Sequence, residues 1–127
     1  MPITYRIDPT RHLVVTEWSG TITIQEARAY FSGLRSDPDF DPTMLHLSNA
    51  LKADAPLTLG ELRLLASESP FADCGRAAIV ASSDLVFGVS KQYKALANRK
   101  SRTIRVFREL DEAFEWLGES RGTDLGG

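Results

Sequence analysis

The sequence predicts an α/β fold, built as a single mixed five-stranded sheet with four helices. Segments with the two-residue period of strands alternate with segments that have the 3.6-residue period of helices. Capping-box patterns at Thr23 and Thr58 mark two helix starts. The chain of 127 residues is long enough for one ordinary core. We expect one domain over residues 1–117 and a flexible tail over residues 118–127, which has few residues that could pack.

The first two segments form a predicted β-hairpin followed by a helix. Ile3–Ile7 alternates apolar and polar residues, Asp8–Arg11 has turn chemistry, and His12–Trp18 is rich in β-branched residues. A helix begins at Thr23. It ends at Asp37, because the residue before a proline avoids the helical region.

Strand–helix units follow the first helix. Met44–Leu47 is a short predicted strand, and Ser48–Pro56 is a long predicted loop before the helix that starts at Thr58. Arg76–Ala81 is apolar without alternation, which is typical of a strand buried on both faces. A further helix begins at Asp84.

The last predicted elements are a strand over Thr103–Phe107 and a helix over Glu109–Leu117, with acidic residues in its first turn. The predicted order is strand-strand-helix-strand-helix-strand-helix-strand-helix. Right-handed crossovers would place the helices on the sheet and make the later strands parallel.

The composition is that of a soluble globular protein, with 43% hydrophobic and 25% charged residues. A net charge of -2 gives no global field that would recruit nucleic acid or an anionic membrane. The single cysteine, Cys74, fits a reducing compartment. The sequence has no apolar run of roughly 20 residues. Met1 leads straight into an alternating segment, so we expect no signal peptide. We therefore expect a cytoplasmic protein without a transmembrane segment.

No motif in the sequence predicts a cofactor, a metal centre or a catalytic set. His12 and His46 stand without a spaced carboxylate or cysteine that could complete a metal site. No local spacing in the sequence predicts a nucleophile paired with a base, although such a pair could still form between residues that are distant in sequence. We expect a non-enzymatic protein that needs no cofactor.

The strand-to-helix turn Ser82-Ser83-Asp84 is the leading candidate site. Ligands and partners usually dock at the carboxyl edge of an open α/β sheet. The free backbone N–H groups at a helix start could hold a polar ligand. The commoner alternative is that Ser83 or Asp84 simply caps the helix.

Two further positions could belong to the same edge. Ser48 and Asn49 open the long predicted loop, where they would either line a crevice or form a turn. The candidate ligand- or partner-binding residues are Ser48, Asn49, Ser82, Ser83, Asp84 and Phe87.

Two other features have competing interpretations. Gly88 lies inside a helix pattern, where glycine costs roughly 1 kcal/mol against alanine. Close helix–sheet packing is the favoured reason, and close approach of a ligand is the alternative. The stretch Lys91–Arg108 contains basic residues and no acid. It is either a patch for an acidic partner or a solvated helix end with an edge strand.

The order of elements resembles the STAS domain and the SpoIIAA-like superfamily, especially its small bacterial single-domain members. The residues that carry the resemblance are Val15–Gly20 before the helix cap, Ala77–Val80 with Phe87-Gly88, and Val106–Leu117. This resemblance covers the chain apart from the tail. It implies a regulatory module that binds a protein partner, with binding of a small amphiphile or lipid as the alternative. Either edge strand could also pair across a two-fold axis in a homodimer.

The chain departs from the superfamily at one functional motif. Anti-sigma-factor antagonists of this superfamily carry an Asp-x-Ser phosphoacceptor after the third strand. This chain has Ser48-Asn49-Ala50 there, without the aspartate and without the hydroxyl at the third position. The phosphoacceptor role therefore passes to no residue of this chain.

Overall fold

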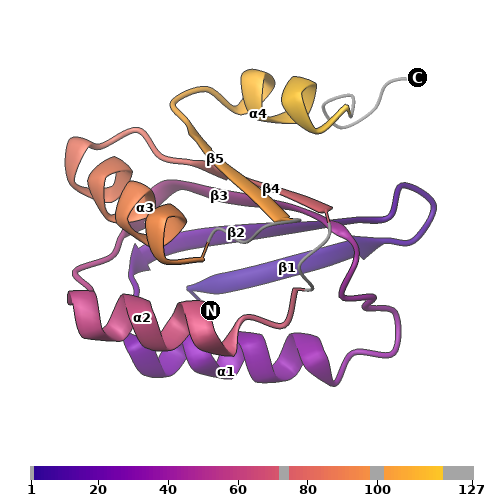
Figure 1. The fold of residues 1–127 in the computed structure, drawn as a ribbon, viewed down its shortest axis with the longest axis horizontal. Coiled ribbons are helices and arrows are strands. Elements are labelled where there is room, and N and C mark those ends of the chain that lie inside the picture. Colours follow the sequence, from indigo (N-terminus) through magenta and orange to yellow (C-terminus); the bar gives the residue numbers. More distant parts are fainter. Residues whose placement is uncertain (1, 72–74, 98–101, 119–127) are drawn as a thin grey trace.

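The computed structural model describes residues 2–71, 75–97 and 102–118 (Figure 1). The predicted order of strands and helices is confirmed. The elements are β1 Ile3–Asp8, β2 Leu13–Thr21, α1 Ile24–Arg35, β3 Leu45–Asp54, α2 Leu59–Glu68, β4 Gly75–Val80, α3 Asp84–Ala97, β5 Arg102–Phe107 and α4 Leu110–Leu117.

The strands form one five-stranded sheet in the spatial order β1-β2-β3-β4-β5. β1 is antiparallel to β2, and all the other neighbours are parallel, so the predicted mixed sheet is confirmed. Helices α1, α2 and α3 cover one face, and α4 covers the other (Figure 1). β1 and β5 form the two edges, and their pairing in a homodimer stays a prediction.

Two capping boxes start α1 and α2 where the sequence places them. The Thr23 hydroxyl accepts from the Glu26 backbone N–H at 3.2 Å, and the Glu26 carboxylate accepts from the Thr23 N–H at 3.0 Å. Thr58 and Glu61 repeat this pattern at 3.1 and 2.9 Å. Each box satisfies two backbone N–H donors that a helix start would otherwise leave unpaired.

The sheet divides the apolar interior into two parts. Between the sheet and helices α1 and α2, the core includes Val14, Phe31 and Leu65. On the opposite face, α4 packs Phe114 and Leu117 against residues such as Leu47, Ala78 and Val80. β4 is thus covered on both faces, as its apolar sequence without alternation predicts.

The third strand is longer than predicted, and the prediction of a long loop over Ser48–Pro56 is wrong. β2 continues to Thr21 beyond a bulge between Glu17 and Ser19, and it pairs with β3 as far as Asp54. Only residues 55–58 connect β3 to α2. The polar residues of this stretch resemble a loop in sequence because several of them lie at solvent-exposed positions of the strand, including Lys52 and Asp54.

Two glycines differ from what their sequence positions indicate. The predicted strand His12–Trp18 continues through Gly20. This glycine lies inside β2 with a φ of 70°, in the left-handed region that glycine tolerates. Gly88 is exposed on α3, and a Cβ there would meet nothing within 4 Å. The interpretation of Gly88 as a site of close helix–sheet packing is therefore wrong.

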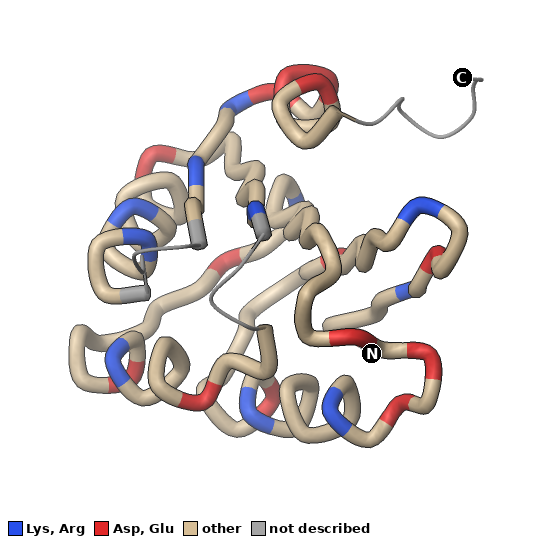
Figure 2. Tube along the Cα trace, turned by 45° about the vertical axis from the view of Figure 1, so that its right-hand side comes forward, with Lys and Arg blue, Asp and Glu red and all other residues tan. Residues whose placement is uncertain are grey.

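The remaining predictions concern segments outside the described residues, membrane spans and the distribution of charge. Cys74 and residues 119–127 of the expected tail lie outside them, and the domain limit at residue 117 stays a prediction. In the part of the chain that the structure describes, no helix is long and apolar enough to cross a membrane. Figure 2 shows basic and acidic residues interspersed over the elements. The described part of the basic stretch Lys91–Arg108 is divided between α3 and the region of β5.

Candidate functional site

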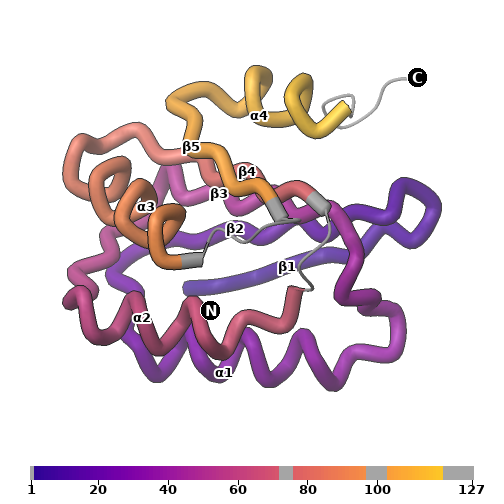
Figure 3. Tube along the Cα trace, in the orientation of Figure 1, coloured from indigo at the N-terminus to yellow at the C-terminus, as the bar shows by residue number. Residues whose placement is uncertain are grey.

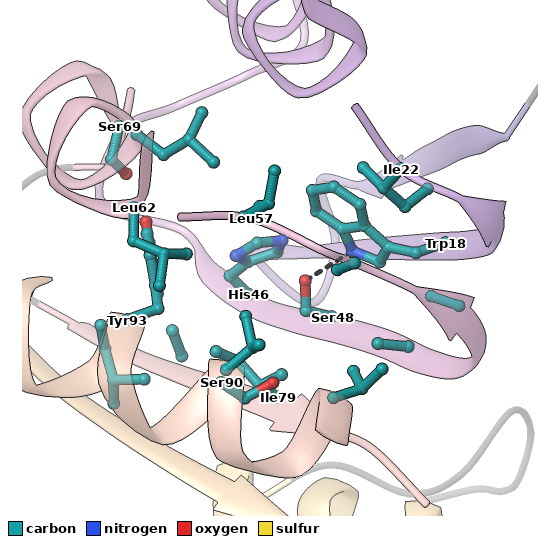
Figure 4. Close-up of a pocket in the computed structure, with 18 of the residues that line it drawn as sticks. Trp18, Ile22, His46, Ser48, Leu57, Leu62, Ser69, Ile79, Ser90 and Tyr93 are labelled. Atoms are coloured by element: carbon teal, nitrogen blue, oxygen red, sulfur yellow. Dashed lines mark hydrogen bonds between the residues drawn. The ribbon is translucent and has the colours of Figure 1, made fainter. Parts of the chain in front are cut away.

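A cavity of about 110 Å³ lies between the sheet and helices α2 and α3 (Figure 4). These two helices run beside each other over the sheet, as the chain trace in Figure 3 shows. Most lining side chains are apolar, and they include Leu62 of α2, Ile79 of β4 and Val86 of α3. An apolar cavity of roughly 150 Å³ holds benzene in another protein. This cavity is somewhat smaller, at about 110 Å³, and therefore suits at most a single small ring.

The cavity exists because small side chains face each other across it. β3 contributes Ser48 and Ala50, β4 contributes Ala77, and α3 contributes Ser90. Such residues cannot span the distance between a sheet and its covering helices, and the layer stays incompletely filled. Ile79 is consequently only half-buried, although its strand lies inside the sheet.

Two buried hydroxyls face the cavity from opposite walls. Ser48 on β3 is 6% exposed, and its hydroxyl accepts a 2.8 Å hydrogen bond from Trp18 Nε1. Ser90 on α3 is 7% exposed, and within the described residues its hydroxyl has no hydrogen-bond partner. Figure 4 shows both side chains at the cavity, one on the sheet and one on the helix. These are groups that could orient a bound molecule.

A polar network stands behind one wall. Thr16 Oγ1 lies 2.6 Å from Tyr30 OH, and His46 Nε2 lies 3.1 Å from Thr16 Oγ1 and 3.3 Å from Tyr30 OH. The His46 ring stacks on Phe71 at 4.2 Å between centroids. Burial raises the pKa of the Tyr30 phenol above its ordinary value, against a lowering by its hydrogen bond with Thr16. Tyr30 therefore stays protonated and can donate within this network.

The cavity wall carries little charge. Among the described residues that line it, none is Lys, Arg, Asp or Glu. No group of three His, Cys, Asp or Glu side chains within the described ranges could hold a metal ion. An ion placed here would lose its hydration without gaining a partner of opposite charge.

Ser48 and Asn49 lie in the middle of β3, so their expected place at a strand end is wrong. They pair with Ile79 and Val80 of β4. Because successive strand residues point to opposite faces, only Ser48 enters the cavity. The Asn49 carboxamide instead accepts a 3.1 Å hydrogen bond from the Leu51 N–H.

The other four candidates do come together, at the carboxyl edge of the sheet. The Ser83 hydroxyl accepts a backbone N–H of the first turn of α3 at 3.1 Å, which is the capping role. Arg108 donates to the Ser82 carbonyl at 2.7 Å and to Asp84 Oδ1 at 3.0 Å. Its guanidinium lies 4.0 Å from the centroid of the Phe87 ring. These polar groups are therefore used by contacts within the chain.

Comparison with known proteins identifies the fold. A scan against protein-family models finds no match, and neither does a search of curated proteins. Among solved structures, the chain is similar to an uncharacterized protein of the DUF3478 family from Shewanella loihica PV-4, which has a SpoIIAA-like fold. The match has a TM-score of 0.60 and covers 91% of this chain and 93% of that one. This chain has a SpoIIAA-like fold. The sequence identity is 18%, so the likeness concerns the fold alone.

Within the SpoIIAA-like fold, Trp18 and Ser90 line the cavity, and no sequence pattern predicts this role for them. Their pattern is that of ordinary amphipathic elements. One signal was present in β3, where His46, Ser48 and Ala50 alternate with Leu45, Leu47 and Asn49. Polar and small residues at every second position of an inner strand indicate a face that is not filled by large apolar side chains.

Proposed function

We propose that this protein binds a small, mainly apolar molecule in the cavity between the sheet and helices α2 and α3. The observation that supports this function best is the cavity itself, which is apolar, about 110 Å³ in volume and lined by a few buried polar groups. Ligand sites in proteins commonly have this character. Ile79 in the cavity wall is only half-buried, so part of its apolar surface is free to contact a ligand.

Toluene is a suitable probe because it is apolar and consists of a single small ring. We expect it to raise the melting temperature of the parent protein in a concentration-dependent way, since a ligand of the folded state stabilises that state by mass action. Absence of any shift in the parent protein, with toluene and with phenol alike, would overturn the proposal.

A filled variant shows where the probe binds. Ala50 lines the cavity, so Ala50→Leu should abolish the toluene shift. The matched control is Ala95→Leu, which adds the same side chain at an exposed position of α3 and should keep the shift. Val89→Phe serves as a second filled variant, because Val89 is a half-buried lining residue. A shift that survives in both filled variants would contradict binding in this cavity.

A regulatory protein partner is the second candidate function, and one observation favours it. Leu85 is 61% exposed at the start of α3, two residues before Phe87 in the sequence. In a pull-down from the native host, Leu85→Ser should lose a partner that the parent retains. Leu59→Ser is the control, because Leu59 is 48% exposed at the start of another helix, α2. If both variants recover the partner protein equally well, Leu85 does not belong to a partner-binding surface.

A further inference from the structure

We infer that the cavity recognises an uncharged ring that carries a hydroxyl group, and that Ser48 and Ser90 bind this hydroxyl from opposite walls. The inference rests on the proposed function, because it names the class of ligand for the same cavity. It is carried by the unpartnered Ser90 hydroxyl, by the remaining hydrogen-bonding capacity of Ser48 and by the absence of charge from the described lining.

Ser90 supplies the first argument. Its side chain lines the cavity and is 7% exposed, and among the described residues its hydroxyl has no partner. Buried hydroxyls are normally hydrogen-bonded, because leaving one unsatisfied costs free energy. A hydroxyl of a bound molecule would supply the missing partner, since each hydroxyl can both donate and accept.

Ser48 supplies the second argument. Its oxygen accepts from Trp18 Nε1, which leaves its own proton to donate. A ligand hydroxyl between the two walls could accept from Ser48 and donate to Ser90. Figure 4 shows these two side chains at the same cavity, Ser48 from the sheet and Ser90 from α3.

The remaining walls favour a flat and neutral molecule. Aromatic side chains of Trp18, Phe71 and Tyr93 line the cavity, and aromatic groups pack well against rings in offset or edge-on arrangements. No Lys or Arg belongs to the described lining, so a carboxylate would enter without a countercharge. The volume of about 110 Å³ limits the ligand to one ring.

Phenol, toluene and benzoate at neutral pH separate these contributions. They share a ring and differ in carrying a hydroxyl, a methyl or a charged carboxylate. Their dissociation constants are measured by NMR titration of the parent protein and of Ser90→Ala. Alanine is a good helix former, so Ser90→Ala should fold. Ser90→Cys keeps the size with a weaker hydrogen-bonding group, and it replaces the alanine variant if that variant does not fold.

We expect Ser90→Ala to weaken phenol binding by about fivefold or more, which is the usual value of one hydrogen bond. Toluene binding should stay unchanged, and benzoate should not bind the parent. If Ser90→Ala changes phenol and toluene binding alike, or if benzoate binds as tightly as phenol, the inference is wrong while the proposed function stands. If neither phenol nor toluene binds the parent, both are wrong.

Discussion

The indole Nε1 of Trp18 on β2 donates a 2.8 Å hydrogen bond to the hydroxyl of Ser48 on β3. This bond joins two neighbouring parallel strands through their side chains, on the sheet face that α1, α2 and α3 cover. Trp18 also meets the Tyr30 ring edge-on, with 5.3 Å between centroids. Ser48 and Tyr30 thus both fix the position of the Trp18 side chain, which forms part of the cavity wall.

Ser48→Ala should destabilise the protein by about 1–2 kcal/mol, because the Trp18 N–H loses its acceptor in a partly buried place. Ser90→Ala is the matched change on the other wall. It removes a hydroxyl that has no partner among the described residues, and it should leave stability unchanged or slightly higher. Urea denaturation of both variants measures the difference. Equal losses in the two variants would contradict the assignment of these hydroxyls.

Tyr30→Phe should cost about 1–2 kcal/mol near neutral pH, because Thr16 and His46 lose a hydrogen-bond partner. The cost should shrink at alkaline pH. Burial raises the pKa of Tyr30, so the folded state keeps a proton that the unfolded state loses above its ordinary pKa of about 10. The stability contributed by this proton is present below pH about 10 and is lost as the pH rises above it.

Phenylalanine has no ionisable group, so the stability of the Tyr30→Phe variant does not depend on this proton. The gap between the unfolding free energies of the parent and Tyr30→Phe should therefore narrow, by up to about 1.4 kcal/mol per pH unit above pH about 10. Urea titrations of both proteins on either side of that pH test the slope. A gap that stays constant would show that Tyr30 ionises equally in both states.

Two glycine-to-alanine changes should have opposite signs. Gly20→Ala should destabilise by about 1 kcal/mol, because a φ of 70° is strained for any residue with a Cβ. Gly88→Ala should stabilise by about 0.5–1 kcal/mol, because Gly88 is an exposed helix residue whose added Cβ meets nothing within 4 Å. Thermal unfolding of both variants gives the two signs. A loss of stability in Gly88→Ala would mean that this glycine serves a structural role.

Arg108→Ala should cost more than Asp84→Ala. The Asp84 side chain is 97% exposed, and exposed ion pairs contribute little. Arg108 also donates to the Ser82 carbonyl and lies over the Phe87 ring, so its removal takes away three contacts. Chemical denaturation in low salt and in high salt separates the ionic part of the loss. A larger loss in Asp84→Ala would show that the ion pair dominates this edge.

The sequence predicted helix starts and strand identities well because these depend on local chemistry. Thr23 and Thr58 form their capping boxes with residues three positions away, so the signal is complete within one turn. The end of β3 was missed because its last residues are held by a distant partner. Lys52 and Asp54 pair with Ser19 and Thr21, and nothing local in their own sequence indicates this.

The candidate site was predicted less well than the fold. The proximity of Ser82, Ser83, Asp84 and Phe87 follows from a strand-to-helix turn, which is visible in the sequence. Their contacts with Arg108 depend on the tertiary fold. A cavity depends on which small residues face each other across layers. Ser48 and Ser90 are distant in sequence, and their approach is decided by how α3 packs over β3 and β5. The void is therefore a tertiary property.

The unequal covering of the sheet has a consequence for synthesis on the ribosome. Three helices that cover one face emerge between or after the strands they pack on, whereas α4 alone covers the other face and is made after all five strands. Until residues 110–117 have been translated, the apolar side chains of Leu13, Leu47 and Val80 have no helix to shield them. The nascent chain therefore exposes an apolar sheet face until late in translation. At this stage, chaperone binding would protect it from aggregation, and premature termination would leave the face uncovered.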